Sequence, residues 1–225
     1  MCGRYTIRFP DRFDARLFGV GEWPDLGPRF NIAPGQDVPL VRVGPLGREV
    51  VMARWGLVPG WAKDAGIGEK LANARGETLA EKPSFRGPWK SHRGLLPADG
   101  FYEWQKSPGV TGKQPWFIRR ADDAPFALGA LWETWRTPDG DALVSCTVIT
   151  TEPNELMRPI HDRMPVIVPR EGWTRWLGDG AARGTPPPAD LVAPCPAGEL
   201  RAHRVSTYVN ATSRDDAPCV EPLAE

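Results

Sequence analysis

The chain has 225 residues and 41% hydrophobic content, so it can bury a core of its own without metals or disulfides. Its 28 basic side chains balance 28 acidic ones, which argues against a protein that coats DNA through bulk electrostatics but leaves room for a local basic groove. No apolar run reaches the roughly 18 residues of a membrane helix, and no secretion signal is evident, so we expect a cytoplasmic protein with no membrane partner.

The beginning of the chain predicts a strand, a short helix and a loop. Residues 1–9 alternate loosely between apolar and polar side chains, as a strand does. Asp11 is a residue type that caps helices, and we expect a short helix after it. The apolar face of that helix would carry Phe13, Leu17 and Phe18. Residues 22–36 are rich in Pro and Gly and predict a loop.

The middle of the chain predicts mainly strands, separated by Gly- and Pro-containing turns such as 44–47. The expected strands are 37–43, 48–55, 93–104, 114–120, 125–135 and 142–150. Residues 55–61 contain too much Gly and Pro for a helix, whereas 69–81 could hold a short helix around 73–80.

The last third of the chain predicts short, mixed elements. We expect helical turns at 152–158, an apolar strand at 164–168, an amphipathic helix at 171–178, a surface loop at 179–198 and a closing strand within 203–222. Strands mostly follow strands, which favours an antiparallel sheet. The fold class is therefore α+β: a single β-rich domain spanning 1–225, with a partly open, barrel-like core and short peripheral helices.

The four cysteines and three histidines do not form a recognisable metal site or disulfide framework. No two cysteines form a CxxC pair, and the histidines are not at metal-ligand spacing. We expect no metal and no cofactor. Nothing in the sequence indicates obligate oligomerisation, so we expect a monomer.

Cys2 follows the initiator methionine, and it is small enough for that methionine to be removed. Removal would leave an α-amine, with a pKa of about 7.7–8.0, and a thiol, with a pKa of about 8.5, on one residue. Such a 1,2-aminothiol reacts with an aldehyde: the amine forms an imine, and the thiol closes a thiazolidine ring on the same carbon. By itself, however, a cysteine at this position is far more often simply a small residue at the start of a strand.

Further motifs along the chain favour a reactive role for Cys2. They lie at 29–36, 53–61, 73–78, 97–104 and 160–165, with Phe85 and Arg86 after the third. In this order, together with 1–4, they resemble the SRAP family, the SOS response-associated peptidase domain. The resemblance extends over nearly the whole chain, from Cys2 to about Pro222.

The resemblance implies that the chain senses abasic sites in single-stranded DNA, including junctions with duplex, and crosslinks to them through mature Cys2 during the DNA damage response. Asn73 would orient the N-terminal group. Glu103 would act as general acid and base, and His161 would move protons and assist reversal. The protein would then be a DNA-repair enzyme with lyase-type imine chemistry, associated with the nucleoid during repair.

DNA contacts are expected from basic and aromatic residues near these motifs. Arginine forks match phosphate oxygens, and indole rings stack on unpaired bases. The expected contacts are Arg4, Arg75, Arg86, Arg163, Trp55, Trp61 and Trp104.

Two other classes of function stay open. A cysteine near Asn, Glu and His could serve acyl transfer, which would make the chain an N-terminal cysteine peptidase that chiefly cuts its own N-terminus. Alternatively, the chain could be a non-covalent binding module for single-stranded or junction DNA, with Cys2 incidental. A covalent product with abasic DNA that depends on Cys2 would distinguish a crosslinking repair enzyme from both alternatives.

Overall fold

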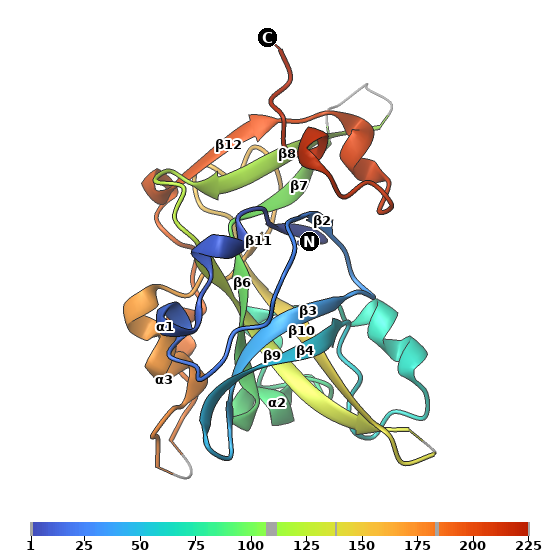
Figure 1. The fold of residues 1–225 in the computed structure, drawn as a ribbon, viewed down its shortest axis with the longest axis vertical. Coiled ribbons are helices and arrows are strands. Elements are labelled where there is room, and N and C mark those ends of the chain that lie inside the picture. The colour runs from blue at the N-terminus through green and yellow to red at the C-terminus, as the bar shows by residue number, and fades with distance from the viewer. Residues whose placement is uncertain (1, 107–111, 138, 183–184, 225) are drawn as a thin grey trace.

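The computed structural model describes residues 2–106, 112–137, 139–182 and 185–224, and its strands form two sheets, one above the other in Figure 1. The upper sheet has the order β12 (Leu200–Arg204), β8 (Lys113–Arg120), β7 (Gly100–Lys106), β1 (Arg4–Ile7) and β2 (Arg29–Ile32). The lower sheet has the order β11 (Met164–Pro165), β10 (Ala142–Thr151), β4 (Gly47–Trp55), β3 (Asp37–Gly44), β6 (Arg93–Ala98) and β9 (Phe126–Arg136), with β5 (Asn73–Arg75) beside β10.

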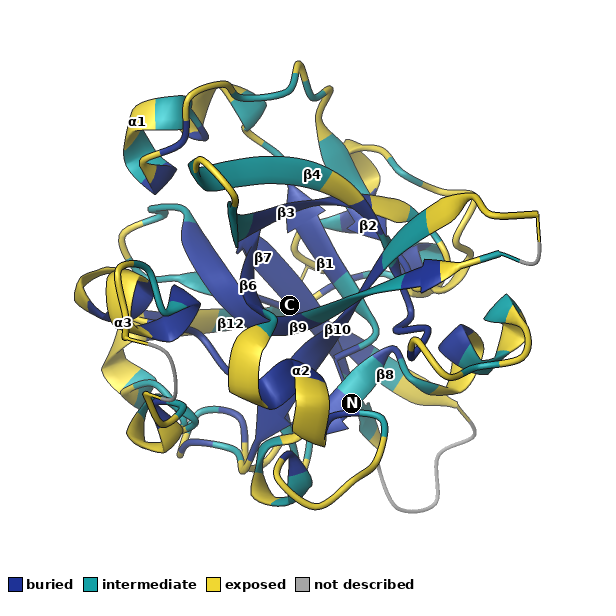
Figure 2. Cartoon of the chain, turned by 90° about the horizontal axis from the view of Figure 1, so that it is seen from below, coloured by how far each residue is buried: buried dark blue, intermediate teal, exposed yellow. Residues whose placement is uncertain are grey.

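The lower sheet closes into a barrel because β10 pairs with β4 on one side and with β9 on the other. Closure pairs strand edges that would otherwise be open to other chains. The barrel-like core expected from the sequence is confirmed, and its ring is complete. Most pairings are antiparallel, as expected, while β10 runs parallel to both β4 and β5. Figure 2 shows the buried strands at the centre, with α2 in front of them and exposed loops around them.

The short helices lie outside the barrel. They are α1 (Ala15–Phe18), α2 (Arg86–Ser91) and α3 (Trp173–Leu177). The amphipathic helix expected at 171–178 is confirmed in α3, whose Trp176 is fully buried and donates its indole N–H to Gly94 O at 2.8 Å. No helix in the described ranges is long and apolar enough to cross a membrane.

The chain passes from the barrel to the upper sheet at Asp99, where one strand was expected over 93–104. The Asp99 carboxylate accepts the Thr6 hydroxyl at 2.6 Å and the backbone N–H of Arg8 at 2.6 Å. These bonds tie the β6–β7 junction to the end of β1, so that the run divides between two sheets. The division places the polar residues of β7 in the upper sheet, beside β1.

The beginning of the chain differs from the prediction in two details. Asp14, and not Asp11, caps α1, because its carboxylate accepts the Leu17 N–H at 2.7 Å. Asp11 instead lies in a 3-10 helix, Pro10–Arg12. The expected loop at 22–36 contains strand β2, which pairs with β1.

The helix expected within 69–81 is wrong. This segment contains the end of a 3-10 helix (Ala65–Lys70), strand β5 and a second 3-10 helix (Gly76–Thr78). The edge of β10 supplies hydrogen bonds to β5 in parallel register, with Val148 opposite Asn73. A strand whose paired residues lie 75 positions away in sequence therefore overrides the local helical pattern.

The last third of the chain is less regular than expected. The helical turns expected at 152–158 are hydrogen-bonded turns at 155–160, and the apolar strand at 164–168 is reduced to β11 and one bridge at Ile167. The loop at 179–198 contains a 3-10 helix (Ala189–Leu191), and its residues 183–184 lie outside the described residues.

The closing strand expected within 203–222 is present only in part: β12 covers His203 and Arg204, and Val205 forms one bridge with Pro222. Strand β12 begins earlier, at Leu200, after a 3-10 helix (Ala197–Glu199). Two more 3-10 helices, Thr207–Asn210 and Ala217–Cys219, follow it. Hydrogen bonds from the side chains of Arg4 and Asn31 hold residues 209–214, where a strand would be held by backbone hydrogen bonds.

Candidate active site

Cys2 is completely buried immediately before β1, and β1 pairs with β7, which carries Glu103. Burial raises the pKa of the Cys2 thiol well above its usual range, and the negative charge of Glu103 raises it further. The thiol is therefore protonated at neutral pH. A nucleophilic role for its sulfur requires a nearby base.

Glu103 can supply that base. Glu103 is 1% exposed. Burial raises the pKa of its carboxyl group to about 7, and the negative charge of Asp162 makes a smaller contribution in the same direction. A carboxyl group with this pKa exists in both protonation states at neutral pH. It can therefore both give and take a proton in one reaction cycle.

His161 lies against Glu103 at the end of the 154–160 turns. The His161 backbone N–H donates to Met157 O at 2.9 Å, and Nε2 of its ring lies 3.8 Å from Oε2 of Glu103. Burial lowers the pKa of the imidazole, which is therefore neutral at pH 7. The structure thus brings Cys2, Glu103 and His161, three of the four predicted reactive residues, into one electrostatically connected group.

Asn73 lies on β5, beside the end of β10 that also pairs with β11. Its Oδ1 atom is buried and has no hydrogen-bond partner among the described residues. A buried acceptor without a partner costs free energy, and a donor from a bound group or from the chain's own amine would remove that cost. Asn73 therefore fits the orienting role implied by the sequence.

A cleft of about 600 Å³ opens beside Cys2 and β7. It is lined by Gly3, Arg4, Ala33, Pro34, Trp104, Lys113, Asn210 and Thr212. These lining residues include two cations and one indole ring but no carboxylate. An elongated anion with planar groups, such as single-stranded nucleic acid, matches this lining.

Residues 206–216, which we call the C-terminal strap, form one wall of the cleft. Asn31 Nδ2 donates to three carbonyls of the strap, and Asp215 of the strap accepts the backbone N–H groups of Phe30 and Asn31. Trp104 is held against the same wall, because its Nε1 donates to Asn210 Oδ1 at 2.8 Å. The sequence had given no role to Asn31, although it lies in one of the ordered motifs.

Arg4 joins the strap to β1. Its guanidinium donates to Asn31 Oδ1 at 2.9 Å, to Val209 O at 2.8 Å and to Asn210 O at 3.2 Å, and it lies 5.7 Å from the centre of the Trp104 ring. These bonds give Arg4 a structural role in addition to its place in the cleft wall. Lys113, which sequence reasoning did not select, is the second cation of the lining.

The other predicted DNA contacts do not line this cleft. Trp55 is 1% exposed and donates its indole N–H to Ala72 O at 2.8 Å, so it is a core residue with no face open to a base; its predicted stacking is corrected here. Trp61 is 61% exposed and lines a separate cavity of about 320 Å³ with Arg86. Arg75 is exposed on β5.

The Arg163 guanidinium is bonded to other groups of the same chain. Its guanidinium donates to both carboxylate oxygens of Glu77, at 2.7 and 2.9 Å, and to Thr150 O at 2.7 Å. These bonds pair Arg163 with protein groups at the position where the sequence had predicted a phosphate contact.

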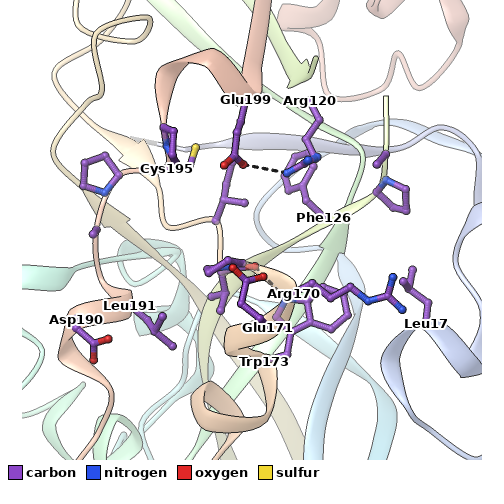
Figure 3. Close-up of a pocket in the computed structure, with 18 residues that line it drawn as sticks. Leu17, Arg120, Phe126, Arg170, Glu171, Trp173, Asp190, Leu191, Cys195 and Glu199 are labelled. Carbon is purple, nitrogen blue, oxygen red and sulfur yellow. Dashed lines mark hydrogen bonds and ion pairs between the residues drawn. The ribbon is translucent and has the colours of Figure 1, made fainter. Parts of the chain in front are cut away.

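Another cavity, of about 500 Å³, lies between the start of β9, α3 and the 189–199 segment (Figure 3). Phe126, Trp173 and Leu191 give it apolar walls, and the ion pair between Arg120 and Glu199 lies at its rim. None of the predicted reactive residues lines it. Within the described ranges, no group of three or more His, Cys, Asp or Glu side chains is arranged to hold a metal ion.

The fold and the site define an α+β barrel protein with a buried cysteine at position 2, a glutamate and a histidine that lie close together, and a cleft lined by two cations. The family model of SRAP, the SOS response associated peptidase, matches residues 1–212. The chain belongs to the SRAP family.

Two similar proteins align with almost the whole chain. It is 41% identical to the abasic site processing protein YoqW of Bacillus subtilis, over 98% of this chain and 99% of the relative. It is 29% identical to the abasic site processing protein HMCES of Pongo abelii, over 99% of this chain and 76% of the relative. An X-ray structure of a protein from Bacteroides thetaiotaomicron has a TM-score of 0.76 at 25% identity, covering 86% of this chain and 85% of that one.

Proposed function

We propose that this protein processes abasic sites in single-stranded DNA by forming a covalent crosslink through Cys2 after Met1 has been removed. The observation that carries the proposal is the group of Cys2, Glu103 and His161 beside a cleft that is lined by cations and an indole. The names of its relatives, abasic site processing proteins, support the same substrate class.

The reaction joins one aldehyde to one aminothiol. The ring-opened sugar of the abasic site presents the aldehyde, and the α-amine of Cys2 adds to its carbon. Loss of one water gives an imine, and the thiol then adds across the C=N bond while its proton passes to the nitrogen. The product is a thiazolidine, and the only by-product is water.

The proposal assigns the proton transfers to Glu103. Opening the sugar ring requires a proton to leave one oxygen and another to reach the ring oxygen, and expulsion of water from the amine adduct requires an acid. A pKa of about 7 equips one carboxyl group for both steps. Asn73, with its unpaired buried Oδ1, would accept a hydrogen bond from the amine and orient it.

His161 would serve the reverse reaction. Its neutral ring lies 3.8 Å from Glu103, so a proton would pass between them through one bridging water, or after a small approach of the two groups, when the thiazolidine reopens. Under this proposal, the protein is a DNA-repair enzyme with lyase-type imine chemistry. It would act as a monomer in the cytoplasm, where its substrate is nucleoid DNA.

The proposed DNA path follows the cleft, with Arg4 and Lys113 beside the phosphates and Trp104 beside an unpaired base. Arg75 on β5 is a further exposed cation. Trp61 and Arg86 line a second hollow, where the exposed indole could stack on the end of a duplex. This arrangement would allow the protein to act at junctions between single-stranded and duplex DNA.

A denaturing gel tests the proposal. Protein verified by mass to lack Met1 is incubated with a single-stranded oligonucleotide that carries one abasic site. We expect a shifted band for the wild type and for Cys146→Ala, a control at another fully buried cysteine, and none for Cys2→Ala. Absence of a shifted band with the wild type would contradict the proposal.

The two alternative functions predict other results. Cleavage of peptides by the purified protein would favour an N-terminal cysteine peptidase, although the raised pKa of the buried Cys2 thiol disfavours a free thiolate at neutral pH. Equal DNA binding by the wild type and Cys2→Ala, with no covalent product, would favour a non-covalent binding module.

A further inference from the structure

Arg163 is fixed by three strong hydrogen bonds. A bidentate pair with Glu77 and a third bond to Thr150 O join the 161–163 segment to β10 and to the 3-10 helix Gly76–Thr78. The Arg163 side chain is only 15% exposed. Bidentate pairs between arginine and carboxylate are directional as well as strong, so they fix the position of the residue that carries them.

The backbone of Arg163 faces His161. The Arg163 N–H donates to Nδ1 of His161 at 3.0 Å. A neutral imidazole has one donor and one acceptor nitrogen, so this bond makes Nδ1 the acceptor and leaves the proton on Nε2. Nε2 is the nitrogen that lies 3.8 Å from Oε2 of Glu103.

A competing group could reverse this arrangement. Oδ1 of Asp162 lies 3.0 Å from the same Nδ1, and a carboxylate there favours a proton on Nδ1. The Asp162 side chain is 88% exposed, so water weakens its attraction. The placement of the Arg163 amide therefore decides which nitrogen of His161 carries the proton.

We propose that Arg163 is a positioning residue: its ion pair with Glu77 holds its own backbone N–H against Nδ1 of His161, so that Nε2 presents its proton toward Glu103. The consequence for reaction rate rests on the proposed function. The ring tautomer does not, because it is a property of the protein without DNA.

The tautomer can be measured by ¹⁵N NMR of the histidine side chains in DNA-free protein at neutral pH, with the His161 signals assigned from His161→Gln. We expect the Nε2-protonated form in the wild type and a mixture of the two forms in both Arg163→Gln and Glu77→Gln. Arg48→Gln is the matched control, because Arg48 is also 15% exposed and ion-paired, with Asp179. Unchanged His161 signals in both test variants would overturn the proposal.

Crosslink reversal gives the second readout. We expect Arg163→Gln and Glu77→Gln each to slow release of abasic DNA on the order of tenfold, the scale of a misplaced catalytic group, with the double variant no slower than either one. If Arg163 instead binds a phosphate, Arg163→Gln would weaken DNA binding while Glu77→Gln, which removes a nearby negative charge, would strengthen it. That pattern would also overturn the proposal.

The two readouts separate the failure of this inference from the failure of the proposed function. A wild type that forms no crosslink would refute the abasic-site proposal and leave the tautomer result standing. A wild type that crosslinks normally, with His161 tautomers unaffected by Arg163→Gln and Glu77→Gln, would refute only the positioning role.

Discussion

The carboxyl group of Glu103 combines a buried position with the capacity to ionise near neutral pH. Burial raises its pKa from 4.5 to about 7, because a charge in the protein interior loses its hydration. The folded state therefore holds the proton more tightly than the unfolded chain does. A shift of this size corresponds to about 3 kcal/mol of stability that depends on pH.

The direction of this dependence follows from the raised pKa. The stabilisation is fully present below about pH 4.5 and is lost as the pH rises through about 7. Glu103→Gln, which cannot ionise, should therefore be more stable than the wild type at pH 8, by up to about 3 kcal/mol, and closest to it near pH 4.5. Urea unfolding of both proteins across this range measures the difference. Parallel stability curves would refute the raised pKa.

His161 should matter more for release than for capture. Its ring is neutral at pH 7, because burial lowers its pKa, and it lies beside Glu103 without itself lining the cleft. We expect His161→Ala to form the crosslink at nearly the wild-type rate and to release it at least tenfold more slowly, within the usual range for a proton-transfer group. Band intensities on a time-resolved denaturing gel give both rates. Equal release rates would show that another group moves this proton.

At the scale of elements, β10 connects the barrel to the candidate site. It closes the ring of strands, and the same strand aligns β5 with Asn73 and β11 after the His161 turn. The upper sheet contributes Glu103, and the β1–β7 pairing brings it to Cys2. The candidate site therefore lies where the two sheets meet.

The C-terminal strap can be tested separately from the chemistry. Asp215 accepts the N–H groups of Phe30 and Asn31 and pairs with Arg29. Asp215→Asn keeps an oxygen for the two backbone N–H groups but removes the negative charge and the oxygen that accepts from Arg29. It should therefore destabilise the protein by about 1–3 kcal/mol, the usual cost of a lost charge-assisted hydrogen bond, and weaken binding of single-stranded DNA by loosening a cleft wall. Asp190→Asn is the control, since it removes an exposed ion pair with Arg175. Unchanged binding and unfolding in Asp215→Asn would exclude this role.

Local patterns in the sequence predicted most strands and missed those that depend on distant partners. The runs that became β3, β4, β8, β9 and β10 carry their own signals, with turn residues between them. Strand β5 has no such signal, because the edge of β10 makes it a strand. The break at Asp99 is equally non-local, since it depends on bonds to Thr6 and Arg8.

The candidate site shows the same limit. Cys2, Asn73, Glu103 and His161 were predicted from the ordered motifs and not from local propensity, and the structure places Cys2, Glu103 and His161 close to one another. The burial of Trp55 and the internal pairing of Arg163 were not predictable, because residue type alone does not say whether an indole or a guanidinium faces solvent. Asn31 and Asp215 were missed because their partners lie on a strap that joins distant parts of the chain.

For the whole molecule, 28 basic and 28 acidic side chains leave no net charge to attract DNA from a distance. Binding should depend on few phosphate contacts, made by Arg4 and Lys113 in the cleft and by exposed cations such as Arg75 and Arg86. With two to four contacts at about 0.7 per phosphate, the plot of log K against log salt should have a slope of about −1.5 to −3. Fluorescence anisotropy of Cys2→Ala with labelled single-stranded DNA measures it. A slope steeper than about −5 would indicate a broad basic face instead.

We propose that residues 1–225 work as one unit, since the N-terminal cysteine, the barrel and the C-terminal strap all contribute to the same cleft and its reactive group. The central claim is that the α-amine and the thiol of Cys2 together capture one abasic site. Retention of Met1 should therefore abolish the chemistry as completely as Cys2→Ala does.

Intact mass spectrometry before and after exposure to abasic single-stranded DNA tests this claim most directly. Before exposure, the protein should have the mass of the chain without Met1. After exposure, we predict a single adduct with the mass of the protein plus the oligonucleotide minus one water, which is stable without reduction and absent from Cys2→Ala. Protein that lacks Met1 and keeps its mass unchanged, or an equal adduct on Cys2→Ala, would contradict the account.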